Sequence, residues 1–129
     1  MYLEIAPMLL VENVDEAIAW YMDVFKAKLQ GTSPQNPPFE WASIQLGNIE
    51  MMFSEKKAAQ RWYTDNVLIA KRPANFIAYI YIGNVNLLYN QIKNKVKVVM
   101  EPVDQPYGIR EFAIQDPLGF TIIFAQIIK

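Results

Sequence analysis

The side chains that carry most enzyme chemistry are absent from this sequence of 129 residues, which contains no histidine and no cysteine. The lack of histidine removes the commonest general base and the commonest transition-metal ligand. The lack of cysteine removes disulfides, thiol nucleophiles and zinc–thiolate sites. Phenols, carboxylates, arginines and aromatic rings remain to build a functional site.

Two phenols, Tyr79 and Tyr81, stand in the apolar segment of residues 76–82. Successive side chains of a strand point to opposite faces, so these two side chains share a face. A buried phenol needs a hydrogen-bond partner, which makes tyrosine a costly core filler. We therefore interpret the pair as candidates for contact with a small molecule. The alternative is that they fill the core or a dimer seam.

Arg110 is the other candidate for a polar contact near the end of the chain. It can pair with an anionic ligand or with Glu111 or Asp116 nearby, and the structural pairing is the favoured alternative. Residues 116–119, with the sequence Asp-Pro-Leu-Gly, are typical of a turn because Asp, Pro and Gly each suit a specific turn position.

The composition limits the classes of protein to which this chain can belong. With 53% hydrophobic residues it can bury a full core, and its length is that of one ordinary domain. A net charge of −1 does not supply the concentrated basic surface that nucleic acid requires. Residues 73–92 are uncharged but interrupted by asparagine, glycine and glutamine, which does not suit a membrane span. We expect a soluble cytoplasmic protein with no nucleic-acid or membrane partner.

The first half of the sequence predicts a strand, a helix and then further strands. Asn13 can cap the helix, with Glu16 three residues later as in a capping box. The dipeptide at residues 47–48, Gly-Asn, is typical of a two-residue hairpin turn. The predicted elements are a strand at 3–11, a helix from 14 to about 28, a loop at 30–38 that a short edge strand can precede, and strands at 39–46 and 49–53.

The second half repeats this order after a charged segment. Residues 54–73 predict a short helix followed by an irregular crossing segment. Asn84 can cap the next helix, whose buried face would hold Val85, Leu88 and Ile92. The remaining predicted elements are a strand at 75–82, a strand beginning at 97–101, and a hairpin formed by residues 108–115 and 120–127.

A shift of 71 residues superimposes the two halves of the sequence. Residues 11–15 then fall on 82–86, and Trp41 falls on Phe112. Each half is too small to bury a sheet face alone, so the two are expected to pair around a core. We predict one domain over residues 1–129, with one module at about 1–55, a linker at about 56–73 and a second module at about 74–129.

The tail of the chain, with YGIREF at residues 107–112 and DPLGF at 116–120, resembles the vicinal oxygen chelate superfamily of glyoxalases, extradiol dioxygenases and bleomycin resistance proteins. Residues 11–21, VENVDEAIAWY, look like the first strand-to-helix junction of that family. The resemblance implies an α+β fold in which duplicated βαβββ modules form two curved mixed sheets around a cavity, with helices outside. It also implies frequent dimerisation, and we predict a homodimer because exposed sheet edges are a liability.

Enzymes of this family hold a divalent metal with one residue from each of four strands. Counting from the matched motifs places these positions at Ala6, Met52, Ile77 and Ile123. All four side chains are apolar and cannot ligate a cation, which needs oxygen or nitrogen donors. We therefore expect no metal and no cofactor.

The same family register predicts a binding cavity. If Ile77 and Ile123 face the cavity, strand alternation turns Tyr79 and Tyr81 the same way. The repeat places Trp41 and Phe112 at equivalent positions, with Met52 as a third apolar wall. The predicted ligand-binding set is Trp41, Met52, Tyr79, Tyr81, Arg110 and Phe112.

Three functions are compatible with these observations. The first is a metal-free protein that binds a planar or aromatic small molecule in a largely apolar cavity. The second is a metal-independent lyase or isomerase in which Glu4, Glu50, Tyr79 or Tyr81 transfers protons, although no paired nucleophile and base identifies catalytic residues. The third is a structural domain whose role is its dimer surface.

Overall fold

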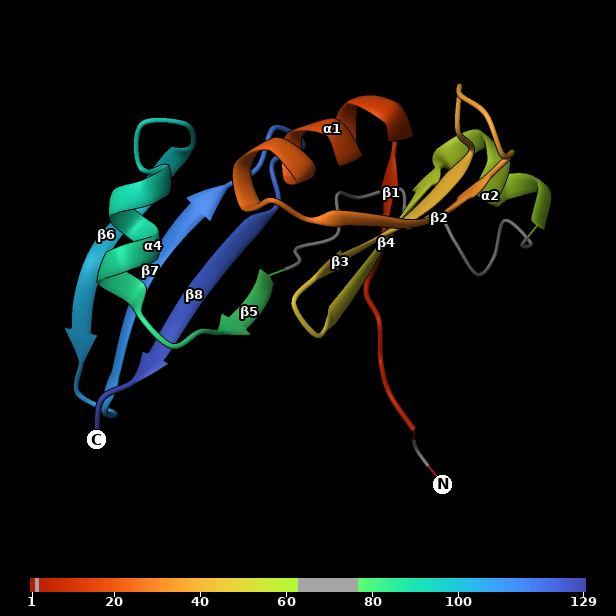
Figure 1. The fold of residues 1–129 in the computed structure, drawn as a ribbon. Helices are drawn as coiled ribbons and strands as arrows, with labels where there is room; N and C mark the ends of the chain where they lie inside the picture. The colour runs from red at the N-terminus through yellow and green to blue at the C-terminus, as the bar shows by residue number, and fades with distance from the viewer. Residues whose placement is uncertain (2, 63–76) are drawn as a thin grey trace. The chain divides into compact units, whose positions relative to one another are not determined.

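A computed structural model describes residues 1, 3–62 and 77–129 of the chain (Figure 1). The chain divides into two compact units, Met1–Pro73 and Ala74–Lys129. Each unit contains one mixed four-stranded sheet and follows the order strand, helix and three strands. The predicted α+β class and the duplicated βαβββ module are therefore confirmed.

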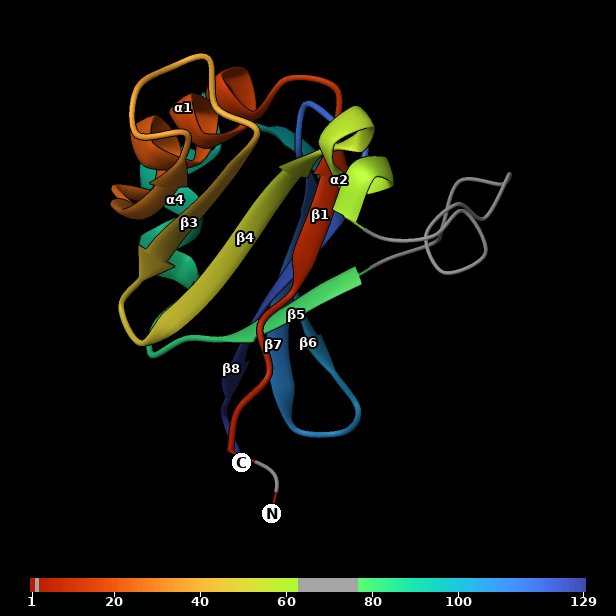
Figure 2. The same cartoon turned by 90° about the vertical axis from the view of Figure 1, so that its right-hand side faces the viewer.

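In the first unit the sheet has the strand order β1-β4-β3-β2, in which β1 runs parallel to β4 and the other neighbours are antiparallel. Figure 2 shows β1 alongside β4. The elements are β1 (Met8–Val11), α1 (Val14–Phe25), β2 (Lys28–Ser33), β3 (Trp41–Leu46), β4 (Ile49–Glu55) and α2 (Lys56–Trp62).

Helix α1 begins and ends where its capping chemistry dictates. The backbone N–H of Glu16 donates to Oδ1 of Asn13 at 3.0 Å, as the sequence predicts. Lys26 adopts a left-handed conformation with φ of 57°, which ends the helix earlier than the predicted residue 28. The apolar face of α1 packs on the sheet, where the Tyr21 ring lies 5.1 Å from that of Phe53.

Predicted strand boundaries in this unit are also wrong. Strand β1 begins at Met8 rather than residue 3, and Leu3 and Ile5 are exposed. Residues 30–33, predicted as the start of a loop, belong to the edge strand β2. That strand ends before Pro34, because proline has no N–H to donate to a sheet.

In the second unit the sheet has the strand order β5-β8-β7-β6, with β5 parallel to β8. Helix α4 contacts β6, β7 and β8, and its first turn is capped by Asn84, whose Oδ1 accepts from the N–H of Leu87 at 3.0 Å. The elements are β5 (Ile77–Tyr81), α4 (Val85–Ile92), β6 (Lys97–Gln105), β7 (Ile109–Gln115) and β8 (Thr121–Ile127).

The turn between β7 and β8 is formed as predicted. Oδ1 of Asp116 accepts from the N–H of Leu118 at 3.0 Å and from that of Phe120 at 2.8 Å. Gly119 adopts φ of +92°, which a residue with a side chain rarely takes. Within the predicted segment 54–73, Ser54 and Glu55 belong to β4 and the short helix is α2, whereas residues 63–73 lie outside the described residues. Within the described part of the chain, no helix is long and apolar enough to cross a membrane.

The repeat between the two sheets changes its offset inside this turn. The pair Met8–Met52 in the first sheet matches the pair Tyr79–Ile123 in the second, at an offset of 71 residues. Strand β7 instead matches β3 at an offset of 70, because Met52 pairs with Ser43 whereas Ile123 pairs with Ala113. The change arises because the segment from Ala113 to Ile123 has one residue more than the segment from Ser43 to Met52. A shift of one residue moves a side chain to the other face of a sheet.

Candidate functional site

The candidate site lies on one face of the second sheet, which we call the tyrosine face. Strand pairing places Tyr79 opposite Ile123 and Tyr81 opposite Ala125, and it places Ala125 opposite Glu111. Directly paired residues share a face, so these side chains project from the same side of the sheet. Helix α4 packs on the opposite side, through the ring contact of Tyr89 with Phe112.

Tyr79 and Tyr81 are brought together on this face, as the sequence predicts. Their ring centroids are 5.4 Å apart and the ring planes meet at 67°, an edge-to-face arrangement. Their exposed fractions are 41% and 62%, and Ile77 on the same face is also exposed. The two rings are therefore not packed as core residues.

A buried carboxylate, Glu111, lies beside the two rings with only 4% of its surface exposed. Its Oε2 accepts from the hydroxyl of Tyr79 at 2.6 Å. Its Oε1 accepts from the hydroxyl of Tyr107 at 2.7 Å and from Nε2 of Gln105 at 3.0 Å. All three donors are neutral, and no ion pair joins Glu111 to a basic side chain within the described residues.

These hydrogen bonds fix the protonation states at neutral pH. Burial acts to raise the pKa of Glu111, but the bonds from Tyr79, Tyr107 and Gln105 together outweigh it and lower that pKa. The bond to Glu111 raises the pKa of Tyr79, and burial and the nearby negative charge raise it further. The pKa of Tyr107 is raised by the same carboxylate. Glu111 is therefore ionised and both phenols keep their protons.

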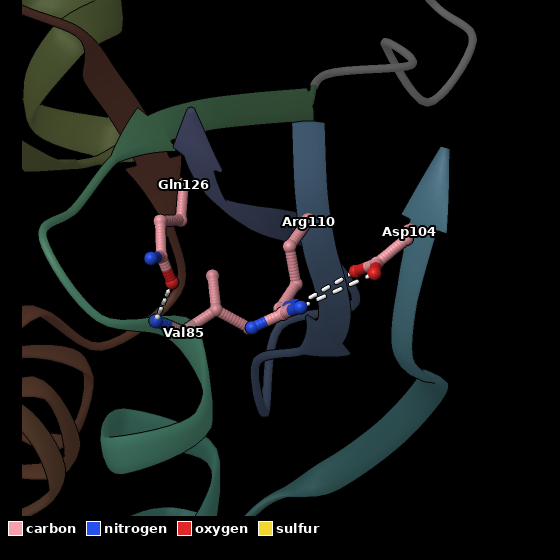
Figure 3. A network of polar contacts seen from close by, with 4 residues as sticks. All are labelled: Val85, Asp104, Arg110 and Gln126. Carbon is pink, nitrogen blue, oxygen red and sulfur yellow. Dashed lines mark hydrogen bonds and ion pairs between the residues drawn. The ribbon is translucent and has the colours of Figure 1, made fainter. Parts of the chain in front are cut away.

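Arg110, a predicted ligand-binding residue, points away from the tyrosine face. It makes two bonds to Asp104, with Nε 2.7 Å from Oδ1 and Nη2 3.2 Å from Oδ2 (Figure 3). Arg110 pairs across the sheet with Gln126, whose Oε1 accepts from the N–H of Val85 at 2.9 Å and so holds the start of α4 on β8. The pairing of Arg110 is structural, as favoured from the sequence, but its partner is Asp104 rather than Glu111 or Asp116.

Phe112 also lies on the side of the sheet that α4 covers. It is completely buried, stacked 5.2 Å from Phe124 and in edge contact with Tyr89 at 5.3 Å. The sequence prediction grouped it with Tyr79 and Tyr81, and the structure does not bring these side chains together. The change of offset in the repeat explains the difference, because Glu111 rather than Phe112 is the counterpart of Trp41.

Trp41 and Met52 share a face of the first sheet, on the side opposite α1. Met52 pairs directly with Ser43, which lies two residues after Trp41 on β3 and therefore on the same face. On this face the hydroxyl of Ser43 donates to Oε2 of Glu50 at 2.6 Å. A Cβ added at Gly31 would lie 3.5 Å from the Trp41 ring, so the ring rests over this glycine. The first sheet thus carries an aromatic ring and a carboxylate on the face that corresponds to the tyrosine face of the second.

The matching family model covers residues 5–124 and describes the glyoxalase/bleomycin resistance protein/dioxygenase superfamily. The chain belongs to this superfamily. Among curated proteins, none is similar enough in sequence to count as a match.

Solved structures agree with this superfamily at the level of the fold. The chain is similar to TioX from Micromonospora sp. ML1, with a TM-score of 0.81 and 17% identity over 98% of this chain and 99% of that one. It is also similar to a glyoxalase/bleomycin resistance protein/dioxygenase from Nocardioides, with a TM-score of 0.78 and 12% identity over 100% and 86% of the two chains. A lactoylglutathione lyase from Agrobacterium tumefaciens gives a TM-score of 0.74 and 16% identity over 96% and 92%.

The metal-ligand positions that the superfamily resemblance implies do not fit a metal in this chain. Met52 lies opposite Met8 in the first sheet, while Ile77 and Ile123 lie on the tyrosine face. Ala6 precedes β1. None of these side chains offers an oxygen or nitrogen donor. Within residues 1, 3–62 and 77–129, no three His, Cys, Asp or Glu side chains lie close enough to share an ion.

Sequence reasoning missed Glu111 as part of the candidate site, together with its partners Tyr107 and Gln105. The available signal was a charged residue within β7, a strand whose next three side chains are all buried and apolar. A carboxylate in such a strand needs several donors. Tyr107, four residues earlier and within the turn before β7, is one of them.

Proposed function

We propose that this protein is a metal-free member of the superfamily that binds a planar or aromatic organic molecule. The observation that carries this proposal is the pair of exposed rings, Tyr79 and Tyr81, on the tyrosine face. Exposed aromatic rings beside fixed polar groups are typical of small-molecule sites, where the rings supply contact area and the polar groups orient the ligand. The bond from Tyr79 to Glu111 holds one ring in place before any ligand arrives.

Proton-transfer chemistry has less support. The lowered pKa of Glu111 makes it a weak base at neutral pH, and the raised pKa of Tyr79 makes that phenol a weak acid. Glu4 is exposed ahead of β1, and Oε2 of Glu50 already accepts a hydrogen bond from the hydroxyl of Ser43. A homodimer, predicted from the sequence, stays a prediction.

The purified protein is expected to carry no stoichiometric divalent metal. The apolar side chains at Met52, Ile77 and Ile123 leave no donor set at the positions that the superfamily uses. Elemental analysis after dialysis tests this expectation. About one zinc, nickel, manganese or iron per chain, retained through dialysis, would contradict the metal-free part of the proposal.

Substitution of Tyr81 by alanine is expected to weaken binding of a planar ligand about two- to tenfold, the range measured for aromatic pair contacts. Because Tyr81 is mostly exposed, folding should suffer little. A fluorescence screen of planar compounds against the parent protein identifies the ligand, and the same titration with Tyr81→Ala measures the loss.

A matched control is Leu87→Ala, which removes an exposed apolar side chain from α4, the helix that packs on the opposite side of the sheet. It should leave the affinity unchanged. The proposal fails if no compound in the library binds the parent protein and if Tyr79→Ala and Tyr81→Ala both lower the melting temperature strongly. The rings of the tyrosine face would then be core residues.

A further inference from the structure

The hydroxyl hydrogens of Tyr79 and Tyr107 are already committed to one carboxylate. A tyrosine hydroxyl has a single hydrogen, and those of Tyr79 and Tyr107 both point to Glu111. The two phenol oxygens can therefore only accept further hydrogen bonds. An ionised carboxylate is also acceptor-only. The cluster formed by Tyr79, Tyr107 and Glu111 thus presents acceptors to a ligand.

The cluster also carries a net negative charge. Glu111 is ionised and nearly buried, yet its three partners are neutral. Its chain neighbour Arg110 is on the opposite side of the sheet and is held there by Asp104. A negative charge with no basic partner among the described residues attracts a cation, and the attraction is stronger near a low-dielectric surface than in water.

The adjacent rings add to the same preference. Tyr79 and Tyr81 expose their π-systems next to the carboxylate. The negative face of an aromatic ring attracts a cation, and the effect grows when the cation is partly desolvated. The acceptors, the charge and the rings therefore favour one kind of partner.

Resting on the proposed function, we infer that the planar ligand of this protein carries a positively charged nitrogen, and that the Tyr79–Glu111–Tyr107 cluster recognises it. An ammonium or amidinium group donates to the phenol oxygens and places its charge against the carboxylate. A carboxylate or carbonyl group placed against these three residues finds no donor among them and is rejected. The cluster thus selects among planar ligands by the sign of their charge.

The experiment uses three probes of the same ring and similar size: naphthylmethylammonium, naphthylmethanol and naphthoate. Each is titrated into the parent protein by calorimetry. The cation should bind at least about tenfold more tightly than the neutral probe, as expected from combined cation–π and charge-assisted contacts. Naphthoate should bind most weakly. Added salt should weaken binding of the cation and leave the neutral probe unchanged.

The variant Glu111→Gln keeps the shape of the side chain and removes its charge, so it should abolish the preference for the cation. Glu16→Gln, an exposed position on α1, changes the net charge by the same amount and should keep that preference. If Glu111→Gln fails to fold, the charge series and its salt dependence on the parent protein decide the question.

The possible failures are distinguishable. If none of the three probes binds and no compound of the planar library binds either, the proposed function fails. If the probes bind but the neutral or anionic one binds as tightly as the cation, the inference about charge is overturned and the proposed function stands. A cation preference that survives in Glu111→Gln would likewise overturn the role of this carboxylate.

Discussion

Substitution of Phe112 by alanine should lower the free energy of unfolding by about 3–5 kcal/mol, the cost typical of a large aromatic ring removed from a packed core. Phe112 has no exposed surface, and its ring is stacked on Phe124 and meets Tyr89 edge-on. Its loss leaves a void between α4 and the sheet, which the surrounding strands can fill only in part. Urea denaturation followed by circular dichroism measures the change.

The control is Tyr81→Ala, which removes an aromatic ring of similar size from the other face of the same sheet. Because that ring is 62% exposed, its removal should cost about 1 kcal/mol or less. The two variants together test which face of the sheet is core. Equal small losses from both, with ligand binding impaired in Phe112→Ala, would contradict the structure and restore the prediction made from the sequence repeat.

The side of the sheet on which Phe112 lies shows which part of a repeated fold the sequence can predict. Capping residues such as Asn13 and Asn84 mark the two strand-to-helix junctions correctly, because a cap acts within one turn of the chain. The order of elements follows from these junctions and from turns such as residues 116–119. The resulting superfamily fold is confirmed.

The facing of β7 could not be predicted in the same way. It depends on the number of residues between paired positions: Met52 lies nine residues after its partner Ser43, whereas Ile123 lies ten residues after its partner Ala113. With few identities between the halves, a single offset of 71 placed Trp41 on Phe112 instead of Glu111. Because of this one-residue difference, the single offset assigned the buried Phe112 to the face on which Glu111 lies.

The partners of Glu111 depend on contacts that are even less visible in the sequence. Gln105 and Tyr107 reach the carboxylate across the β6–β7 turn, and the pairing of these strands contains irregularities between Val98 and Val103. Strand periodicity does not predict facing beyond a bulge. The predicted Tyr79 and Tyr81 were correctly placed together because a single regular strand carries both.

The ionisation of Tyr79 is the second large effect that we expect. A phenol normally loses its proton at about pH 10, but the hydrogen bond to Glu111, burial and the adjacent negative charge hold the pKa of Tyr79 well above that range. A raised pKa means that the stability contributed by this bond is present below about pH 10 and is lost as the pH rises through the folded-state value. Tyrosinate absorbance should therefore show one phenol, missing in Tyr79→Phe, that ionises only in strong alkali.

The matched variant Glu111→Gln decides the cause of this shift. It removes the charge and leaves an amide oxygen that can still accept from the phenol, so the pKa of Tyr79 should fall towards its ordinary value. Because the chain has seven tyrosines, the titration of Tyr79 is obtained as the difference between a protein and its Tyr79→Phe form, in both the parent and the Glu111→Gln background. If the difference curve of the parent already has its midpoint at about pH 10, the bond between Tyr79 and Glu111 does not persist in solution. The acceptor-only character of the Tyr79–Glu111–Tyr107 cluster would then lose its physical basis.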